Sequence, residues 1–182
     1  MNEKLREVEQ KWYALSQELY ELRKETTPEP VSDFELQTAS GPKKLSELFG
    51  TYRDLIVVHN MGGSCNYCTL WADGYSGYLR HLSERTAFVV CSPDSPENQA
   101  KLAAARGWKF EMVCDASKEF TSAMGFWSEE HGWWPGVSAF HLNEDGSIVR
   151  TNRDMLGPGD AYCMVWPMFS LLKDGPNGWE PH

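Results

Sequence analysis

Two cysteines three positions apart, Cys65 and Cys68, are the residues whose types and spacing most directly suggest chemistry. An apolar run at 55–58 precedes them, and a glycine-rich turn at 60–64 joins that run to the first cysteine. Apolar residues then recur at helical spacing. This order predicts a strand, a turn and a helix that begins at Cys65, and a C-x-x-C pair in that setting is most often a redox motif.

The chemistry follows from the place of the pair in the chain. A helix N-terminus carries unpaired N–H groups and partial positive charge, and both favour a thiolate over a thiol. A cysteine there can have a pKa of roughly 7 or lower, against about 8.5 for a free thiol. We therefore expect Cys65 to attack a substrate, and Cys68, one turn further on, to resolve the product by closing a redox-active disulfide.

Zinc binding is the first alternative. Zinc usually takes four ligands, as two C-x-x-C pairs or as one pair with two histidines spaced H-x₃₋₅-H. The other cysteines are isolated, and the histidines never fall at that spacing: Cys91, Cys114 and Cys163; His59, His81, His131, His141 and His182. A metal site assembled from distant residues stays open, as does a cysteine pair that has lost its chemistry.

Two further residues are candidates for proton transfer. His59 lies six residues before Cys65, at the end of the apolar run. It is either a general base near neutral pH or a hydrogen-bonded core histidine. Asp73 follows one turn past Cys68 and is either the proton acceptor or a solvent-facing or cap-bonding acid.

Aromatic residues are dense, with 8 Trp, 7 Tyr and 8 Phe. Trp71, Trp133 and Trp134 are candidates for the wall of a substrate groove, although core packing accounts for each of them taken singly. The adjacent pair 133–134 is the better candidate for a functional surface. Cys91, Cys114 and Cys163 lie in apolar surroundings and are expected to be buried small hydrophobes.

Composition limits the class of protein. The chain has 182 residues, 41% of them hydrophobic and 24% charged, which fits one globular domain with an extension. A net charge of −9 argues against nucleic-acid binding. No apolar stretch reaches the length of a membrane span, and the N-terminus lacks the apolar region of a signal peptide. We therefore expect a cytoplasmic protein with no membrane partner.

The first segment, 3–24, predicts one amphipathic helix. Its apolar residues recur at spacings of three and four: Leu5, Val8, Trp12, Leu15, Leu19 and Leu22. Such a stripe packs either on the helix's own domain or in a homodimer, and we expect the former more than the latter. Prolines then end the helix. The predicted organisation is an N-terminal helix at 1–27 and a domain at 28–182.

Strands and helices alternate through the rest of the chain. We expect strands at 34–37, 54–59, 86–91 and 110–114, and helices from Cys65 to about 83, at 96–106, at 119–124 and at about 160–173. Asp-Gly predicts a hairpin between 137–142 and 147–151. The segment 126–136 is expected to be a loop. Gly74 and Gly77 suggest close packing or a kink in the helix that follows the cysteines. This order predicts an α/β fold with parallel strands and an antiparallel edge.

The pattern resembles that of the thioredoxin-like superfamily. A strand, a C-x-x-C at a helix start and a proline before the last hairpin are its features, and the segments 34–50 and 90–97 resemble peroxiredoxin-type members. The resemblance implies a thioredoxin-like fold, with a central mixed sheet flanked by helices. It also implies that Pro135 has a cis peptide bond opposite the cysteines and shapes a substrate-binding edge.

More narrowly, the chain is similar to an uncharacterised bacterial thioredoxin-like family, domain of unknown function eight-nine-nine. The similar features are the N-terminal helix, Cys65-x-x-Cys68, the run Trp-Ala-Asp-Gly at 71–74, Pro135 and the tail at 178–181. This resemblance supports the fold more than any reaction.

The chain departs from better-known relatives at several positions. Asn66 and Tyr67 stand between the cysteines, where thioredoxins have Gly-Pro and glutaredoxins Pro-Tyr. Peroxiredoxins place a proline and a hydroxyl residue seven and three positions before their reactive cysteine, and here those positions are Val58 and Gly62. The first departure leaves the redox potential of the pair unpredictable, and the second weakens the prediction of a thiol peroxidase. We expect a thiol-disulfide oxidoreductase, with a thiol peroxidase or a non-catalytic or metal-binding module as alternatives.

The predicted activity needs no organic cofactor. Its expected partners are a protein or small-molecule disulfide or thiol and an unidentified electron donor, with a homodimer through the N-terminal helix as a further possibility.

Overall fold

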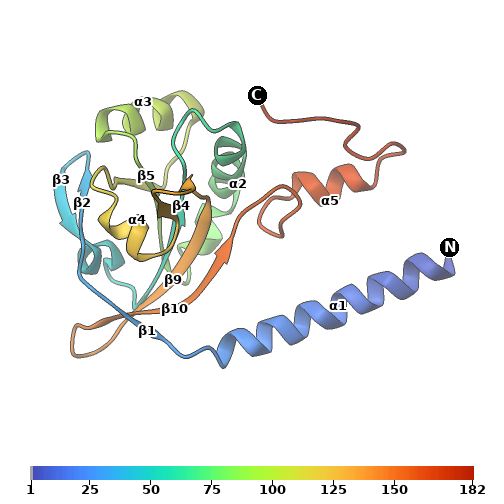
Figure 1. Cartoon of the computed structure of the whole chain (residues 1–182), viewed down its shortest axis with the longest axis horizontal. Coiled ribbons are helices and arrows are strands. Elements are labelled where there is room, and N and C mark those ends of the chain that lie inside the picture. Colours follow the sequence, from blue (N-terminus) through green and yellow to red (C-terminus); the bar gives the residue numbers. More distant parts are fainter. Residues whose placement is uncertain (1) are drawn as a thin grey trace.

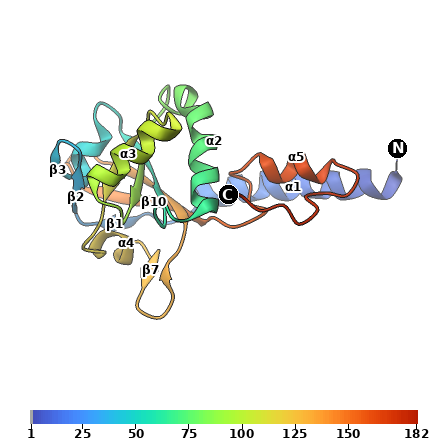
Figure 2. The same cartoon turned by 90° about the horizontal axis from the view of Figure 1, so that it is seen from above.

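A computed structural model describes residues 2–182 and shows an α/β body with two extensions (Figure 1). The first is the helix α1 (Glu3–Lys24), and the second is the C-terminal segment that contains α5 (Val165–Ser170). Both extend to the same side of the body (Figure 2). No helix within residues 2–182 combines the length and the apolar character that crossing a membrane requires.

The body is organised by a mixed eight-stranded sheet with the order β1-β10-β9-β4-β5-β6-β2-β3. The strands are β1 (Glu29–Val31), β2 (Glu35–Thr38), β3 (Gly41–Lys44), β4 (Asp54–His59), β5 (Ala87–Ser92), β6 (Glu111–Cys114), β9 (Gly136–Leu142) and β10 (Ile148–Met155). The central strands β4, β5 and β6 are parallel, and the remaining pairs are antiparallel. The predicted parallel strands, antiparallel hairpin and α/β class are therefore confirmed.

Helices cover both faces of the sheet and enclose two hydrophobic cores. The helices of the body are α2 (Asn66–Leu82), α3 (Pro96–Arg106), α4 (Glu119–Ala123) and the 3-10 helix η1 (Leu45–Phe49). Because strand side chains alternate between faces, Leu55 and Val57 enter the core that contains Phe120 of α4. Val58 enters the opposite core, which contains Cys68 of α2. We call these the α4-side core and the α2-side core.

Local signals determine the ends of α3 as expected. The Ser95 side chain accepts the Asn98 N–H at 3.3 Å, with Pro96 in the first turn. Gly107 ends the helix in the left-handed conformation, with φ of 72°.

The C-terminal helix is shorter than predicted. The carboxylate of Asp160 accepts the N–H groups of Gly157, Tyr162 and Cys163 at 2.7–3.1 Å. A side chain that binds nearby backbone in this way holds a turn in competition with a helix. The α-helix therefore covers only Val165–Ser170 instead of 160–173.

The segment predicted as a loop contains a second, two-stranded sheet. Trp127–Ser128 (β7) pairs with Gly132–Trp133 (β8). The Trp134 N–H donates to the Phe126 carbonyl at 2.8 Å, which continues this pairing beyond the strands. Gly74 and Gly77 are not closely packed, because a Cβ added at either position meets no atom within 4 Å.

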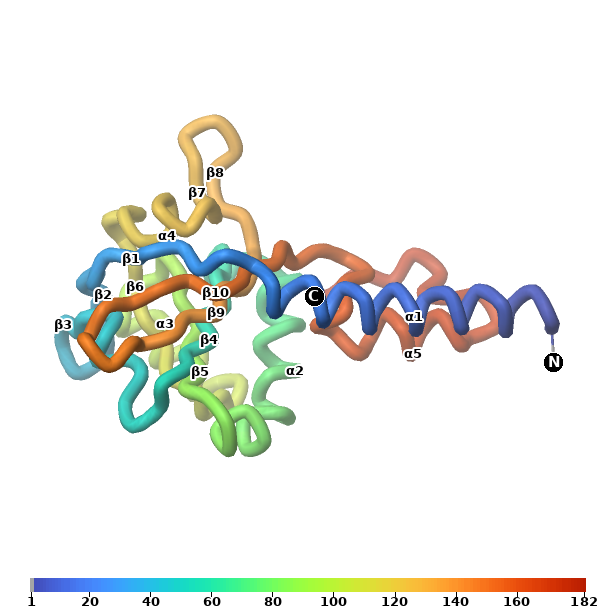
Figure 3. The backbone as a smooth tube through the Cα atoms, turned by 90° about the horizontal axis from the view of Figure 1, so that it is seen from below, coloured from blue at the N-terminus to red at the C-terminus, as the bar shows by residue number. Residues whose placement is uncertain are grey.

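The helix α1 does not pack on its own body, contrary to expectation. None of its residues is buried, and the six residues of its apolar stripe are exposed by 47–68%. At its last turn Arg23 forms an ion pair with Asp154, and the Arg23 carbonyl accepts the Asn152 side chain at 3.0 Å. From this attachment α1 points away from the body (Figure 3).

Candidate redox site

Cys65 caps the N-terminus of α2. It has extended backbone angles, and its sulfur accepts the Cys68 N–H at 3.2 Å. Its carbonyl accepts both the N–H and the hydroxyl of Thr69, at 3.0 and 2.9 Å. The prediction that the helix starts at the first cysteine is confirmed, and the sulfur occupies the place where helix N–H groups lack intrahelical partners.

The surroundings of Cys65 favour its thiolate. A hydrogen bond from the Cys68 side chain and further ones from the backbone at Cys68 and Tyr67 lower the pKa of Cys65 to about 6, although partial burial opposes this shift. The residue Cys65 is half-buried, so part of it remains exposed to a reactant. At neutral pH most of this group is therefore a thiolate.

Cys68 has the opposite character. It is 1% exposed, and its sulfur accepts the Met61 N–H at 3.4 Å. Its hydrogen bond to Cys65, together with burial, raises the pKa of Cys68 far above that of an ordinary thiol. The pair is thus divided into one accessible thiolate and one buried thiol.

The turn before Cys65 is held by two side chains. The Asn60 side chain accepts the Gly62 N–H at 2.8 Å and donates to the Cys68 carbonyl at 3.4 Å. Asp94, which follows β5, accepts the Gly63 N–H at 2.7 Å. Gly62 has φ of +104°, a conformation that other residues rarely adopt. The sequence predicted a turn here, but it did not indicate that Asn60 and Asp94 hold the turn by hydrogen bonds.

His59 lies on the other face of the sheet from the cysteines. Its ring stacks on Phe126 at 4.2 Å between centroids, and Nε2 is 3.0 Å from the Ser138 hydroxyl. Burial, followed by the charge of Arg150, lowers the pKa of His59 to about 3, so the ring is neutral. Its Nδ1 is buried with no hydrogen-bond partner. These contacts belong to the α4-side core, and the structure does not bring His59 together with the dithiol.

Asp73 faces α3 and the residues after it. Its carboxylate accepts from the Arg106 guanidinium at 2.7 Å and from the Trp108 indole at 2.8 Å. Both oxygens are engaged in joining two elements, and no contact with Cys68 is present among its hydrogen bonds.

The predicted aromatic wall is divided between two places. Trp71 is buried in the α2-side core, with its indole N–H unpartnered. Trp133 and Trp134 belong to the β7–β8 hairpin, where Trp134 is 48% exposed. Pro135 follows this hairpin and is buried.

The expected cis bond before Pro135 is wrong, because every peptide bond in residues 2–182 is trans. The backbone on both sides is extended and held by hydrogen bonds. The Trp134 N–H donates to Phe126, and the Pro135 carbonyl accepts the Leu156 N–H at 3.0 Å.

An aromatic cluster beside the dithiol was missed by the sequence analysis. Tyr67, between the two cysteines, lies 6.3 Å from Trp71 and 6.0 Å from Trp166 of α5, measured between ring centroids. Trp166 in turn meets Trp179 at 6.0 Å. The C-terminal segment thus lies over the first turn of α2. The aromatic residues of this segment were the only sign of such a contact in the sequence. Because Trp166 is far from Tyr67 along the chain, the sequence did not indicate that the two rings meet.

The remaining cysteines are buried, as expected: Cys91, Cys114 and Cys163. Burial raises the pKa of each of their thiols. Within residues 2–182, no group of three or more His, Cys, Asp and Glu side chains is arranged to hold a metal ion.

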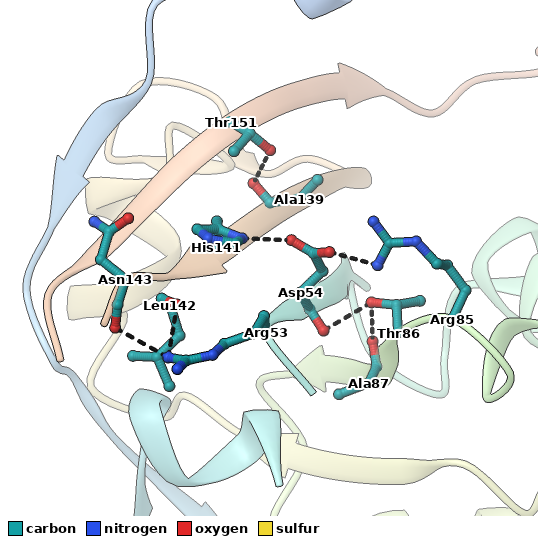
Figure 4. A network of polar contacts seen from close by, with 10 residues as sticks. All are labelled: Arg53, Asp54, Arg85, Thr86, Ala87, Ala139, His141, Leu142, Asn143 and Thr151. Atoms are coloured by element: carbon teal, nitrogen blue, oxygen red, sulfur yellow. Dashed lines mark hydrogen bonds and ion pairs between the residues drawn. The ribbon is translucent and has the colours of Figure 1, made fainter. Parts of the chain in front are cut away.

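A polar network lies at the opposite end of β4 from the cysteines (Figure 4). Asp54 bonds His141 at 2.7 Å and Arg85 at 2.5 Å, and Arg53 donates to the carbonyls of Leu142 and Asn143. Although burial acts to raise it, these bonds hold the pKa of Asp54 below its ordinary value. The network joins β4, β5 and β9 at their far ends and leaves the dithiol end free.

A family model described as "Bacterial protein of unknown function (DUF899)" matches residues 2–182. No curated protein sequence matches the chain.

Several solved peroxiredoxins have a similar fold. The chain is 23% identical to the peroxidoxin BcpB from Mycobacterium tuberculosis, with a TM-score of 0.56 over 68% of this chain and 82% of that one. It is 15% identical to a cysteine-to-serine mutant of peroxiredoxin Q from Xanthomonas campestris, with a TM-score of 0.59 over 71% and 86%. The chain is 15% identical to reduced Prx3 from Vibrio vulnificus in complex with H₂O₂, with a TM-score of 0.56 over 73% of this chain and 86% of that one. The chain therefore has a thioredoxin-like fold of the peroxiredoxin type, with an added N-terminal helix.

Proposed function

The chain belongs to the bacterial family of unknown function DUF899, and from the geometry of its cysteine pair we propose that it is a thiol-disulfide oxidoreductase. The observation that carries this proposal is the asymmetry of the pair. Cys65 is half-buried, with a pKa of about 6, while Cys68 is a buried thiol one turn away. An accessible nucleophile next to a protected resolving thiol is what disulfide exchange requires.

The reaction begins with the Cys65 thiolate attacking one sulfur of a substrate disulfide. A new sulfur–sulfur bond joins Cys65 to the substrate, and the other substrate sulfur leaves as a thiolate that takes a proton from water. Cys68 then gives its proton to water and attacks the Cys65 sulfur. The Cys65–Cys68 disulfide forms and the second substrate thiolate leaves, so two electrons have passed from the protein to the substrate.

The first step itself activates Cys68. The hydrogen bond to Cys65 is the largest cause that raises the pKa of Cys68. Once Cys65 is bound to substrate it carries no negative charge, so this cause disappears and the pKa of Cys68 falls. The attack by Cys65 thus favours the deprotonation of Cys68, although burial continues to raise the pKa of Cys68.

The proposed substrate is a disulfide or thiol of a protein or a small molecule, and a separate donor must return the electrons. Pro135, Trp133 and Trp134 stay our candidates for a substrate-binding edge. The 48% exposure of Trp134 supports this role, because it leaves an aromatic face open to a partner. Trp71 and Pro135, which are both buried, are the weaker candidates.

A thiol peroxidase is the second candidate, and the peroxiredoxin fold is the observation that favours it. The Cys65 thiolate would attack a peroxide oxygen, forming a sulfenic acid and releasing an alcohol or water. The Cys68 thiol would then displace water to form the same disulfide. Against this, Gly62 offers no hydroxyl three positions before Cys65, where peroxiredoxins have one.

The deciding experiment is a redox titration of the full chain. The protein is equilibrated in glutathione or dithiothreitol buffers, its thiols are alkylated under acid quench, and the mass is read. We expect a reversible two-electron couple between about −120 and −270 mV. It is lost in Cys65→Ser and kept in Cys114→Ser, the matched control. A pair that never forms a disulfide contradicts the proposal.

The same preparations separate the alternatives. Rapid peroxide consumption with a dithiol donor, and slow disulfide exchange, would favour the peroxidase. Stoichiometric metal after chelator-free purification, lost in Cys65→Ser, would favour a metal-binding module.

A further inference from the structure

The apolar stripe of α1 is the first of two surfaces that this chain leaves uncovered. Its side chains are exposed by about half or more: Leu5 52%, Val8 54%, Trp12 68%, Leu15 65%, Leu19 47% and Leu22 54%. We call this set the arm stripe. A contiguous apolar surface of this kind is uncommon on a monomer and marks an interaction site.

The second surface is an apolar groove on the body, between α2 and β9. It consists of a cavity of about 380 Å³ and an adjoining one of about 180 Å³, which share Ile56, Val137 and Tyr162. Tyr75, Tyr78 and Leu82 line it from α2, Ala139 from β9, and Met164 from the C-terminal segment. We call it the α2 groove. It exposes part of a sheet face, which a folded domain normally covers with a helix.

The two surfaces do not meet within one chain. The helix α1 is attached through its last turn and points away from the body (Figures 1 and 3). Its base nevertheless lies at the end of the groove, because Arg23 lines the smaller cavity together with Asp154 and Tyr162. A second chain placed there can therefore reach the groove with its own arm.

We propose that the α2 groove is the docking site for the arm stripe of a second copy of this chain, with the two copies exchanging arms about a two-fold axis. The 22-residue helix is about 33 Å long. A stable interface buries about 800 Å² on each partner. Two arm–groove contacts, each with six large apolar side chains, supply surface of that order.

Symmetry supports a second copy as the occupant over another partner. An isologous dimer uses the same two surfaces twice, so both uncovered surfaces of both chains are buried by one arrangement. An arm pairing only with another arm would leave the α2 groove open. A small apolar molecule in the groove would leave the arm stripe open.

The test is the mass of the full-length protein in solution, measured by light scattering during gel filtration. We expect twice the chain mass of 20.7 kDa. Leu15→Glu on the arm should give monomers, and so should Tyr78→Glu or Ala139→Glu in the groove. The matched controls are Gln17→Glu, on the opposite side of α1, and Arg80→Glu, on the exposed side of α2; both should remain dimers. Near-ultraviolet circular dichroism identifies a variant that has lost its fold.

Mixing the variants separates arm exchange from arm pairing. Leu15→Glu keeps its groove and Tyr78→Glu keeps its arm, so an equimolar mixture has one intact arm–groove contact and should regain dimer. A wild-type monomer overturns the proposal. So does a groove variant that is folded and dimeric, because arm-to-arm pairing then holds the dimer.

Discussion

The backbone N–H of Cys68 donates to the sulfur of Cys65 at 3.2 Å, so each cysteine depends on the other before any disulfide forms. The same residue that will resolve the intermediate also stabilises the charge that starts the reaction. The properties of the pair therefore cannot be assigned to either residue alone.

Alkylation of Cys65 should follow its thiolate. With a pKa of about 6, the thiolate fraction and the alkylation rate should increase roughly tenfold between pH 5 and pH 7. Mass spectrometry after timed iodoacetamide pulses gives this rate for each cysteine. The unfolded chain is the control, and its alkylation rate should have a pH midpoint of about 8.5. A folded-state midpoint as high as that of the unfolded chain would contradict the proposed activation.

Replacing Cys68 should both trap the intermediate and weaken the nucleophile. In Cys68→Ala the hydrogen bond from the thiol is lost while the backbone N–H remains, so the pKa of Cys65 should rise. With a disulfide substrate this variant should accumulate the mixed disulfide, visible as an added mass that dithiothreitol removes. Rapid turnover without a trapped species would show that Cys68 does not resolve it.

His59 should make the fold sensitive to mild acid. The pKa of His59 is about 3 in the folded chain and about 6.5 in the unfolded chain. Below pH 6.5, His59 is therefore protonated in the unfolded chain while it stays neutral in the folded chain. Stability is thus lost as the pH falls, by about 2 kcal/mol between pH 7.5 and 5. Urea titrations of wild type and His59→Gln at both values measure this difference. An equal pH dependence in the two proteins would contradict it.

Gly136→Ala should destabilise the body strongly. A Cβ at this position would lie 1.9 Å from a ring carbon of Phe126, which packs directly on the strand beside His59. Overpacking of this kind costs about 3 kcal/mol, measured by urea unfolding. Gly157→Ala is the control, because a Cβ there meets no atom within 4 Å. Partial recovery in Gly136→Ala with Phe126→Leu would identify the ring as the cause.

Asp73→Asn distinguishes a bracing residue from a proton acceptor. Since the carboxylate binds Arg106 and Trp108, and is partly exposed, we expect a loss of less than about 1 kcal/mol in stability. The rate of disulfide exchange should stay within about twofold. A rate loss near a hundredfold, with a changed pH profile, would instead make Asp73 the acceptor for the Cys68 proton.

What the sequence predicted well is local. The helix at Cys65 and the caps of α3 follow from residues a few positions apart, and the structure confirms them. The position of His59 relative to the dithiol could not be predicted in this way. The alternation of side chains along β4 indicates that His59 and Val58 face opposite sides of the sheet, but it does not indicate on which side the dithiol lies. Only the packing of α2 decides that.

Long-range contacts were beyond the sequence for the same reason. The stripe on α1 indicates an apolar face without saying what covers it. Asn60 and Asp94 brace the cysteine turn through hydrogen bonds that leave no spacing pattern. Tyr67 and Trp166 are about a hundred positions apart, and no periodicity joins them.

Asp154 brings the two ends of the chain to a single point. Its carboxylate accepts from Arg23 at the base of α1 and from the Tyr162 hydroxyl at 2.8 Å, where the C-terminal segment begins. The first of these ends carries the helix α1, and the second leads to Trp166, which lies over the first turn of α2. A mutation of Asp154 would therefore loosen the attachment of both segments to the body at once.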